Sequence, residues 1–197
     1  AKQFNSKVVF ASSSSVYGDQ INFPISEDAN KKPLNPYGQT KLDDEKLASK
    51  YAAQGLRVIG LRYFNVFGIG QNPSYAGVIP QFIQKISKHE SPIIEGDGNQ
   101  IRSFTFIDDV VRANYLAFES KIDHDFFNIA TEKMTTINEL AELLIKMSEL
   151  DLKSIYKNQR QGDIKKSYAD ISKAKKLLRW NPEINLENGL KEIFPKI

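Results

Sequence analysis

The sequence contains no cysteine and only two histidines among its 197 residues. Without cysteine there is no disulfide framework, no thiolate zinc site and no cysteine nucleophile, and two histidines leave little for a histidine-rich metal site. We therefore assign no residue to a metal. Serine, tyrosine, lysine and carboxylate side chains must carry any chemistry that the chain performs.

Long apolar runs and a strong charge of one sign are absent as well. No run approaches the roughly 20 apolar residues of a membrane-spanning helix, and the first residues, AKQFNSKVVFASSSS, lack the order of a signal peptide. The 27 lysines and arginines against 24 acidic residues leave a formal charge of only +3, too small a surplus to indicate nucleic acid as the main partner. We expect a soluble, cytoplasmic protein that binds neither nucleic acid nor a membrane.

Apolar, strand-like runs alternate with segments of helical period almost throughout the chain. This pattern is typical of an α/β fold with a largely parallel sheet, and 41% hydrophobic residues suffice for a sizeable core. The patterns predict strands over residues 7–11, 56–62, 103–107 and 126–129, and helices over residues 35–55, 78–89, 108–120, 136–147, 171–178 and 186–194.

One pair of residues at the start of the helix predicted over 35–55 suggests catalysis. Tyr37 and Lys41 are four residues apart, so their side chains project from one face, one helical turn apart. A neighbouring ammonium group favours the phenolate and lowers the pKa of a tyrosine toward the range of a general base. The pair alone also fits an ordinary exposed surface pair. Ser13, at the end of the first buried strand, adds a hydroxyl that could bond a substrate oxygen while Tyr37 deprotonates it.

These residues lie in motifs that run along nearly the whole chain. The motifs are FASSSSVYGD (10–19), NPYGQTKLDDEK (35–46), LRYFNVFGIGQ (61–71), VIPQFI (78–83), EGDGNQIRSFTFIDDVV (95–111), FNIA (127–130) and RQGD (160–163). Together, and in this order, they resemble the extended short-chain dehydrogenase/reductase family, and within it the NAD-dependent nucleotide-sugar epimerases of the UDP-glucose 4-epimerase type.

The resemblance implies 4-epimerisation of a UDP-sugar through a transient 4-keto intermediate, with NAD as a bound cofactor. Tyr37 would take the proton from the C4 hydroxyl, Lys41 would lower the pKa of Tyr37 and hold the nicotinamide ribose, and Ser13 would bond the reacting oxygen. By the same resemblance, the cofactor is contacted by Ala11, Ser12, Tyr37, Lys41 and Tyr63.

The resemblance also implies a set of substrate contacts. Asn65 would bind the sugar diphosphate, Val78 would meet the uridine, and Ser13 and Ser15 would lie at the sugar. Forked guanidinium donors suit phosphate oxygens, and the arginines in the matching positions are Arg102 and Arg160. Asp163 would accept hydrogen bonds from ribose or neighbouring hydroxyls. For two of these residues a plainer role remains open, because Asn65 could only shape a turn and Asp163 could only cap the next element.

Two departures from related enzymes narrow the function. Where nucleotide-sugar 4,6-dehydratases carry an aspartate and a glutamate to expel water, this chain has Ser14 and Ser15, and hydroxyls cannot perform that proton transfer near neutral pH. Ser167 stands where epimerases restricted to UDP-glucose tend to carry a bulky aromatic residue. A small residue leaves room for an N-acetyl group, so we expect UDP-GlcNAc and UDP-GalNAc as substrates besides UDP-glucose and UDP-galactose.

The glycine-rich turn that holds the NAD pyrophosphate in this family is missing. The segments GIGQNP (68–73) and GDGNQI (96–101) lack its third glycine. We therefore expect the C-terminal part of a Rossmann-like, doubly wound parallel sheet with a smaller α/β substrate-binding subdomain, with roughly the first 100 residues of the family fold absent from the sequence. Residues 1–75 would form the rear of the NAD-binding domain, and residues 76–197 mainly the nucleotide-sugar subdomain, with segments around 103–130 returning to the sheet.

The resemblance implies that the missing N-terminal portion completes the sheet. It also implies a homodimer. Two other functions stay open. The chain could catalyse another reaction of the same family, as a decarboxylase, reductase or dehydratase, because Ser13, Tyr37 and Lys41 would serve several of these reactions. It could also be a non-catalytic fragment that binds nucleotide sugars.

Overall fold

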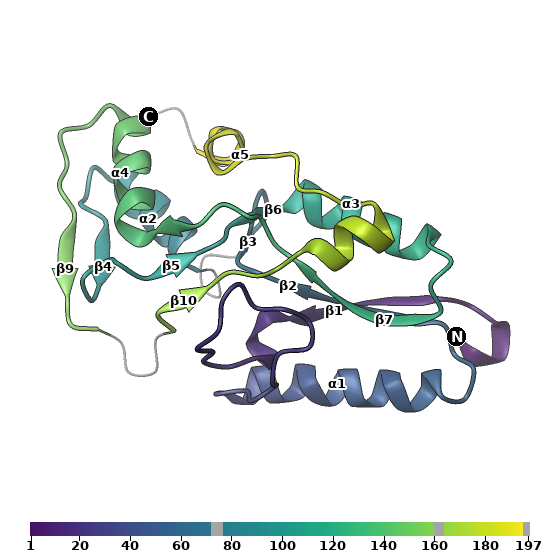
Figure 1. Cartoon of the computed structure of the whole chain (residues 1–197). Coiled ribbons are helices and arrows are strands. Elements are labelled where there is room, and N and C mark those ends of the chain that lie inside the picture. The colour runs from purple at the N-terminus through teal and green to yellow at the C-terminus, as the bar shows by residue number, and fades with distance from the viewer. Residues whose placement is uncertain (72–76, 160–163, 195–197) are drawn as a thin grey trace.

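The computed structural model of the protein describes residues 1–71, 77–159 and 164–194. Its main sheet has three parallel strands, β1 (Val8–Ser13), β2 (Val58–Tyr63) and β7 (His124–Ile129), in the order β1-β2-β7 (Figure 1). Because the strands are parallel, their carboxyl ends meet at one edge of the sheet, where ligands bind in doubly wound folds.

Helices cover both faces of this sheet. Helix α1 (Pro36–Ala52) lies along one face, and helix α3 (Ile107–Glu119) and the π-helix η3 (Ala174–Leu178) lie on the other (Figure 1). The sequence sets where α1 begins: the Asn35 side chain accepts a hydrogen bond from Gly38 N at 2.8 Å, and Pro36 occupies the first turn, where its missing N–H is no loss. The expected α/β fold with a doubly wound parallel sheet is confirmed.

Gly60, in the middle of β2, is where two aromatic rings close over the sheet. A Cβ at this position would lie 2.6 Å from the Phe126 ring and 2.9 Å from the Phe10 ring. These rings come from the neighbouring strands and meet edge to face, with 6.3 Å between their centroids. Glycine therefore lets the rings pack across the central strand.

A smaller part of the molecule is built from three helices and short strands. The helices are α2 (Val78–Ile86), α4 (Ile137–Ser148) and α5 (Leu186–Ile193). The strands pair as β10-β5-β8, β3-β6 and β4-β9, and are β3 (Val66–Phe67), β4 (Ile93–Glu95), β5 (Ile101–Arg102), β6 (Thr105–Phe106), β8 (Thr135–Thr136), β9 (Ile155–Lys157) and β10 (Lys166–Ser167).

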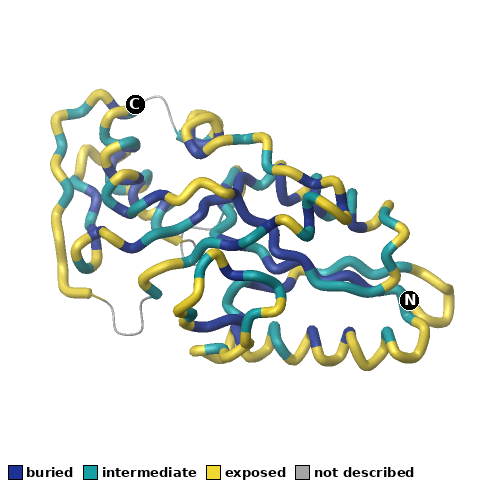
Figure 2. The backbone as a smooth tube through the Cα atoms, in the orientation of Figure 1, coloured by how far each residue is buried: buried dark blue, intermediate teal, exposed yellow. Residues whose placement is uncertain are grey.

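Each part has its own hydrophobic core. The core of the main sheet includes Leu61, Phe127 and Trp180, all fully buried, and the second core includes Phe82 and Leu144. Figure 2 shows these buried stretches as dark blue along the strands and along the inward sides of the helices, whereas the outer side of α1 is exposed. No helix in residues 1–71, 77–159 or 164–194 is long and apolar enough to cross a membrane.

The short strands are the main difference from the sequence expectations. All seven have only two or three residues, too few to show a period, and six of them, all except β6, were not expected from the pattern. The strand expected over 103–107 is only two residues long, because helix α3 already begins at Ile107. The helix expected over 78–89 ends at Ile86, and His89 lies beyond it with a left-handed φ of 58°.

Candidate active site

The first turn of α1 lies directly on the serine-rich loop that follows β1. This loop forms the 3-10 helix η2 (Ser14–Val16), whose first backbone N–H groups include Ser15 N, 3.1 Å from the accepting Ser13 Oγ. A Cβ at Gly38 would lie 2.5 Å from the Ser15 carbonyl oxygen, so glycine permits the close approach. Tyr37 precedes Gly38, and its side chain is exposed, with no hydrogen bond from its hydroxyl to any described residue.

Lys41 joins the next turn of α1 to the strand. Its Nζ donates a hydrogen bond to the Ala11 carbonyl oxygen at 3.0 Å and lies 3.5 Å from Asp44 Oδ2. The helix therefore holds Tyr37 and Lys41 on one face, at the carboxyl end of β1, next to the loop that begins at Ser13. The structure thus brings together β1 and α1, the two elements that carry the predicted catalytic residues.

A buried polar network lies behind these residues, and its charged members are absent from the set predicted from the sequence. The Glu45 carboxylate accepts hydrogen bonds from Ser12 Oγ at 2.6 Å and from Arg62 Nε and Nη2 at 2.8 Å each. Arg62 Nη1 also bonds Tyr17 Oη at 2.7 Å. Burial raises the pKa of Tyr17 well above its usual value, and burial likewise raises the pKa of Glu27, which accepts from Asn128 N.

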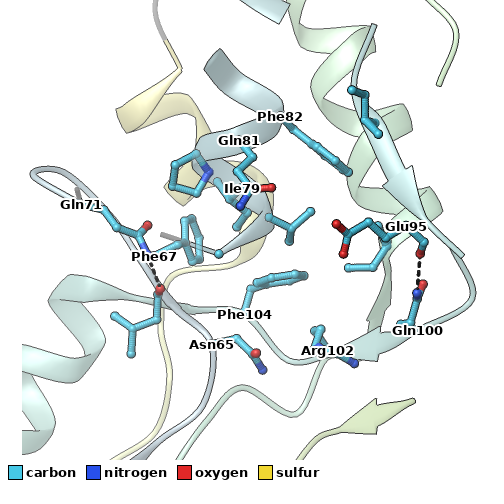
Figure 3. Close-up of a pocket in the computed structure, with 16 residues that line it drawn as sticks. Asn65, Phe67, Gln71, Ile79, Gln81, Phe82, Glu95, Gln100, Arg102 and Phe104 are labelled. Carbon is cyan, nitrogen blue, oxygen red and sulfur yellow. Dashed lines mark hydrogen bonds between the residues drawn. The ribbon is translucent and has the colours of Figure 1, made fainter. Parts of the chain in front are cut away.

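The larger of two adjoining cavities has a volume of about 350 Å³ and opens between α2 and the β5–β6 region. Its wall is mainly aromatic and aliphatic, with amide groups and one charge of each sign at its rim. Figure 3 shows the Phe104 ring at the centre, with Asn65 and Arg102 on one side and Ile79 and Gln81 on the other. Flat apolar walls with a few donors and acceptors suit a nucleobase.

The smaller cavity, of about 280 Å³, continues from the first, because Asn65 and Arg102 line both. Its polar lining includes Ser14, Ser15 and Ser167. The two cavities therefore form one elongated site that connects the wall of α2 with the serine-rich loop after β1.

Asn65 shapes this junction through its backbone as well as its side chain. Its φ is 38°, in the left-handed region, its Nδ2 donates to the Ser103 carbonyl oxygen at 3.0 Å, and its own carbonyl oxygen accepts from Thr105 N at 3.2 Å. Asn65 thus shapes a turn and also lines both cavities, and its contact with the sugar diphosphate stays a prediction.

The other predicted residues fall into three groups. Val78 lines the larger cavity, whereas Ser13, Tyr37 and Lys41 line neither. The side chains of two predicted cofactor contacts already make hydrogen bonds within the protein. Ser12 Oγ donates to Glu45, and the Tyr63 hydroxyl donates to Asn114 Oδ1 at 2.9 Å. Burial raises the pKa of Tyr63. The predicted residues outside the described part of the chain are Arg160 and Asp163.

Comparison with known proteins places the chain in a family. A model of the family described as GDP-mannose 4,6 dehydratase matches residues 1–193. The chain therefore belongs to this family of extended short-chain dehydrogenases/reductases, as the motifs had indicated.

Its relatives include several enzymes of UDP-sugars. A putative UDP-glucose 4-epimerase of Methanocaldococcus jannaschii is 41% identical over 95% of this chain and 61% of its own length. The structure of UDP-N-acetylglucosamine 4-epimerase from Methanobrevibacter ruminantium, in complex with UDP-N-acetylmuramic acid, is 40% identical with a TM-score of 0.88, covering 95% of this chain and 63% of that one.

A third similar protein was solved with NAD. This is UDP-glucuronic acid 4-epimerase from Bacillus cereus in complex with UDP-glucuronic acid and NAD, 34% identical with a TM-score of 0.88 over 95% of this chain and 60% of that one. Not every relative is an epimerase, because one at 35% identity is named as a decarboxylase. The chain spans about 60% of the length of the relatives that it matches.

Proposed function

We propose that the protein takes part in the NAD-dependent 4-epimerisation of a UDP-sugar. The observation that carries this proposal is the meeting of α1 and β1 at one edge of the sheet: Tyr37 exposes a free hydroxyl, Lys41 lies one turn away, and the Ser13 loop packs against the same turn. The elongated site begins at this loop and ends at an apolar wall. One end therefore suits proton transfer at a sugar, and the other suits binding of a nucleotide.

Three side chains would act on the sugar. Tyr37 would accept the proton of the C4 hydroxyl as a phenolate, because its side chain is exposed and its hydroxyl has no hydrogen-bond partner among the described residues. Lys41 would act beside it, one helical turn away on the same face. Ser13 Oγ, which already accepts from Ser15 N, keeps its own proton for donation to the reacting oxygen.

The residues present fit one end of NAD. The Tyr37 hydroxyl and the Lys41 ammonium lie at the carboxyl end of a parallel strand, where dinucleotides bind in doubly wound sheets, and β1 pairs only with β2 among the described strands. NAD supplies a hydride acceptor when it is bound. The sequence has no glycine-rich pyrophosphate turn, so we propose that a segment beyond these 197 residues supplies that part of the site and pairs with the open edge of β1.

The nucleotide end would hold the UDP moiety. Val78 and the Phe104 ring offer an apolar wall to the uracil, and Arg102, at the junction of the cavities, offers a forked cation to the diphosphate. Arg160 and Asp163 keep their proposed roles at the diphosphate and the ribose. Residues 1–75 would carry catalysis, and residues 76–197 would mainly bind the substrate.

Ser167 would set the range of sugars. It lines the smaller cavity with a short side chain, which leaves space for an N-acetyl group, so UDP-GlcNAc and UDP-GalNAc join UDP-glucose and UDP-galactose as proposed substrates. In Ser167→Tyr, we expect turnover of the N-acetylated sugars to fall at least tenfold relative to UDP-glucose. Unchanged relative rates in a coupled product assay would contradict this role.

Product analysis separates the remaining candidates. A decarboxylase, as one relative is named, releases carbon dioxide from a UDP-uronic acid, whereas an epimerase only inverts C4. A non-catalytic fragment would bind UDP and return every sugar unchanged. Incubation with NAD and each UDP-sugar, followed by chromatography of the products, distinguishes the three. A cytoplasmic location and a homodimer stay predictions.

A further inference from the structure

The Glu45–Arg62 ion pair lies almost completely out of water. Glu45 is 4% exposed and Arg62 1%. All three guanidinium nitrogens are used: Nε and Nη2 bond the two oxygens of the Glu45 carboxylate at 2.8 Å each, and Nη1 bonds Tyr17 Oη at 2.7 Å and the Glu27 carbonyl oxygen at 2.9 Å. Four of the five N–H groups of the guanidinium are therefore paired, which fixes its orientation.

This pair ties α1 to every strand of the main sheet. Ser12, Arg62 and Asn128 are register partners on β1, β2 and β7, so their side chains lie in one row on the same face. Ser12 Oγ donates to Glu45 from one end of the row, and Tyr17 Oη donates to Asn128 Oδ1 at 2.6 Å at the other. Glu45 is the residue through which α1 joins this row.

Glu45 lies on the same face of α1 as the proposed catalytic pair, Tyr37 and Lys41. Tyr37, Lys41 and Glu45 follow each other at intervals of four, so Glu45 is about 6 Å along the helix from Lys41 and about 12 Å from Tyr37. Lys41 bonds Ala11, and Glu45 bonds the next residue of β1, Ser12. A slip of α1 along β1 would break the bonds of Glu45 as well as that of Lys41.

The stability of the folded protein alone does not explain why a buried ion pair such as Glu45–Arg62 is present. Two buried charges lose their hydration, and well-packed apolar residues often serve the folded state as well or better. Proton transfer is more demanding, because a misplacement of about 1 Å can cost roughly 100-fold in rate. A charge pair with fixed bond directions defines one helix position more sharply than apolar contacts do.

We propose that Glu45 and Arg62 are positioning residues, which set the register of α1 against β1 and thereby hold Tyr37 and Lys41 in reach of the sugar bound beside Ser13. The inference rests on the proposed function for its catalytic consequence. Its structural consequence, the fixed register of α1, can be measured without any reaction.

The test variant replaces both charges together, as Glu45→Met with Arg62→Met, so that no unpaired charge is left buried. We expect a folded protein in which kcat for UDP-sugar epimerisation falls at least tenfold while KM changes less than threefold, because the cavities are lined by other residues. Amide hydrogen exchange in α1 should become at least tenfold faster. Retained kcat together with unchanged exchange would overturn the proposal.

Two further variants keep the test decisive. Asp109→Asn removes another buried carboxylate, on α3 and outside both cavities, and should lower stability while kcat and α1 exchange stay unchanged. Arg62→Lys keeps the charge but cannot bond both Glu45 oxygens, so it should lower kcat severalfold if the double variant does not fold. Full activity in Arg62→Lys would overturn the proposal. If the unaltered protein epimerises no sugar, the proposed function fails, and α1 exchange alone decides the positioning role.

Discussion

Replacement of Arg102 should weaken UDP binding without unfolding the protein. Among the described residues that line the larger cavity, Arg102 is the only cation and Glu95 the only anion, and Arg102 also lines the smaller cavity. In Arg102→Met, the diphosphate would lose the charged donor at the junction of the cavities and face the Glu95 carboxylate, while Lys166 of the smaller cavity stays in place. Hydrogen bonds to charged groups contribute about 1.5–3 kcal/mol each, so one lost bond predicts a rise in the UDP Kd of roughly 10- to 150-fold.

Isothermal titration of UDP into both proteins measures this change directly. Arg179→Met is the matched control, because Arg179 is exposed and lines neither cavity, so its Kd should equal that of the unaltered chain. Added salt should weaken UDP binding to the unaltered chain more than to Arg102→Met, because the screened attraction is already lost in the variant. An Arg102→Met protein that binds UDP within threefold of the unaltered chain would refute the assignment of the diphosphate to Arg102.

Two further predictions concern stability. Asp109, 1% exposed, accepts hydrogen bonds from Glu183 N and Ile184 N, so Asp109→Asn should cost about 3 kcal/mol and lower Tm by roughly 6–12 °C, whereas the exposed Asp108→Asn should not move Tm in the same circular-dichroism melt. Hydrogen bonds from the backbone N–H and the hydroxyl of Thr136, the N-cap residue of α4, hold the pKa of Glu139 below its ordinary 4.5. Ionised Glu139 therefore stabilises the folded protein above pH 4.5, and this stabilisation is lost as the pH falls through the lowered pKa. In Glu139→Gln, the free energy of unfolding, measured with urea at several pH values, should fall less steeply toward acid pH than in the unaltered chain. An unchanged pH dependence would contradict this role of Glu139.

Local signals in the sequence were sufficient for the main elements. The asparagine cap and Pro36 located the start of α1, and its end at Ala52 follows from the loss of the apolar pattern before Gly55. The strands β1, β2 and β7 were recognisable because each contains an apolar run within six residues, which is long enough to show a pattern. Ser13 at the end of β1 and the Tyr37–Lys41 spacing then predicted one end of the proposed site.

The buried ion pair could not be predicted in the same way. Glu45 stands in a helix rich in charged residues, and Arg62 ends a strand, so each is compatible with a surface position by itself. The charges come together only because the register of β1 against β2 places Arg62 beside Ser12 and α1 packs Glu45 against both. The cavity walls depend on the fold as well: Phe104 and Val78 are far apart in the sequence but line the same cavity, and the short strands near them have no readable period.

Proton NMR of UDP-GlcNAc, incubated with the protein and NAD, tests the proposed chemistry most directly. The account predicts that signals of the C4 epimer grow until both sugars reach equilibrium. It also predicts that Tyr37→Phe abolishes this growth while its UDP Kd stays unchanged, because Tyr37 lines neither cavity. Equal conversion by Tyr37→Phe, or a sugar that stays unchanged although UDP and NAD are bound, would contradict the account.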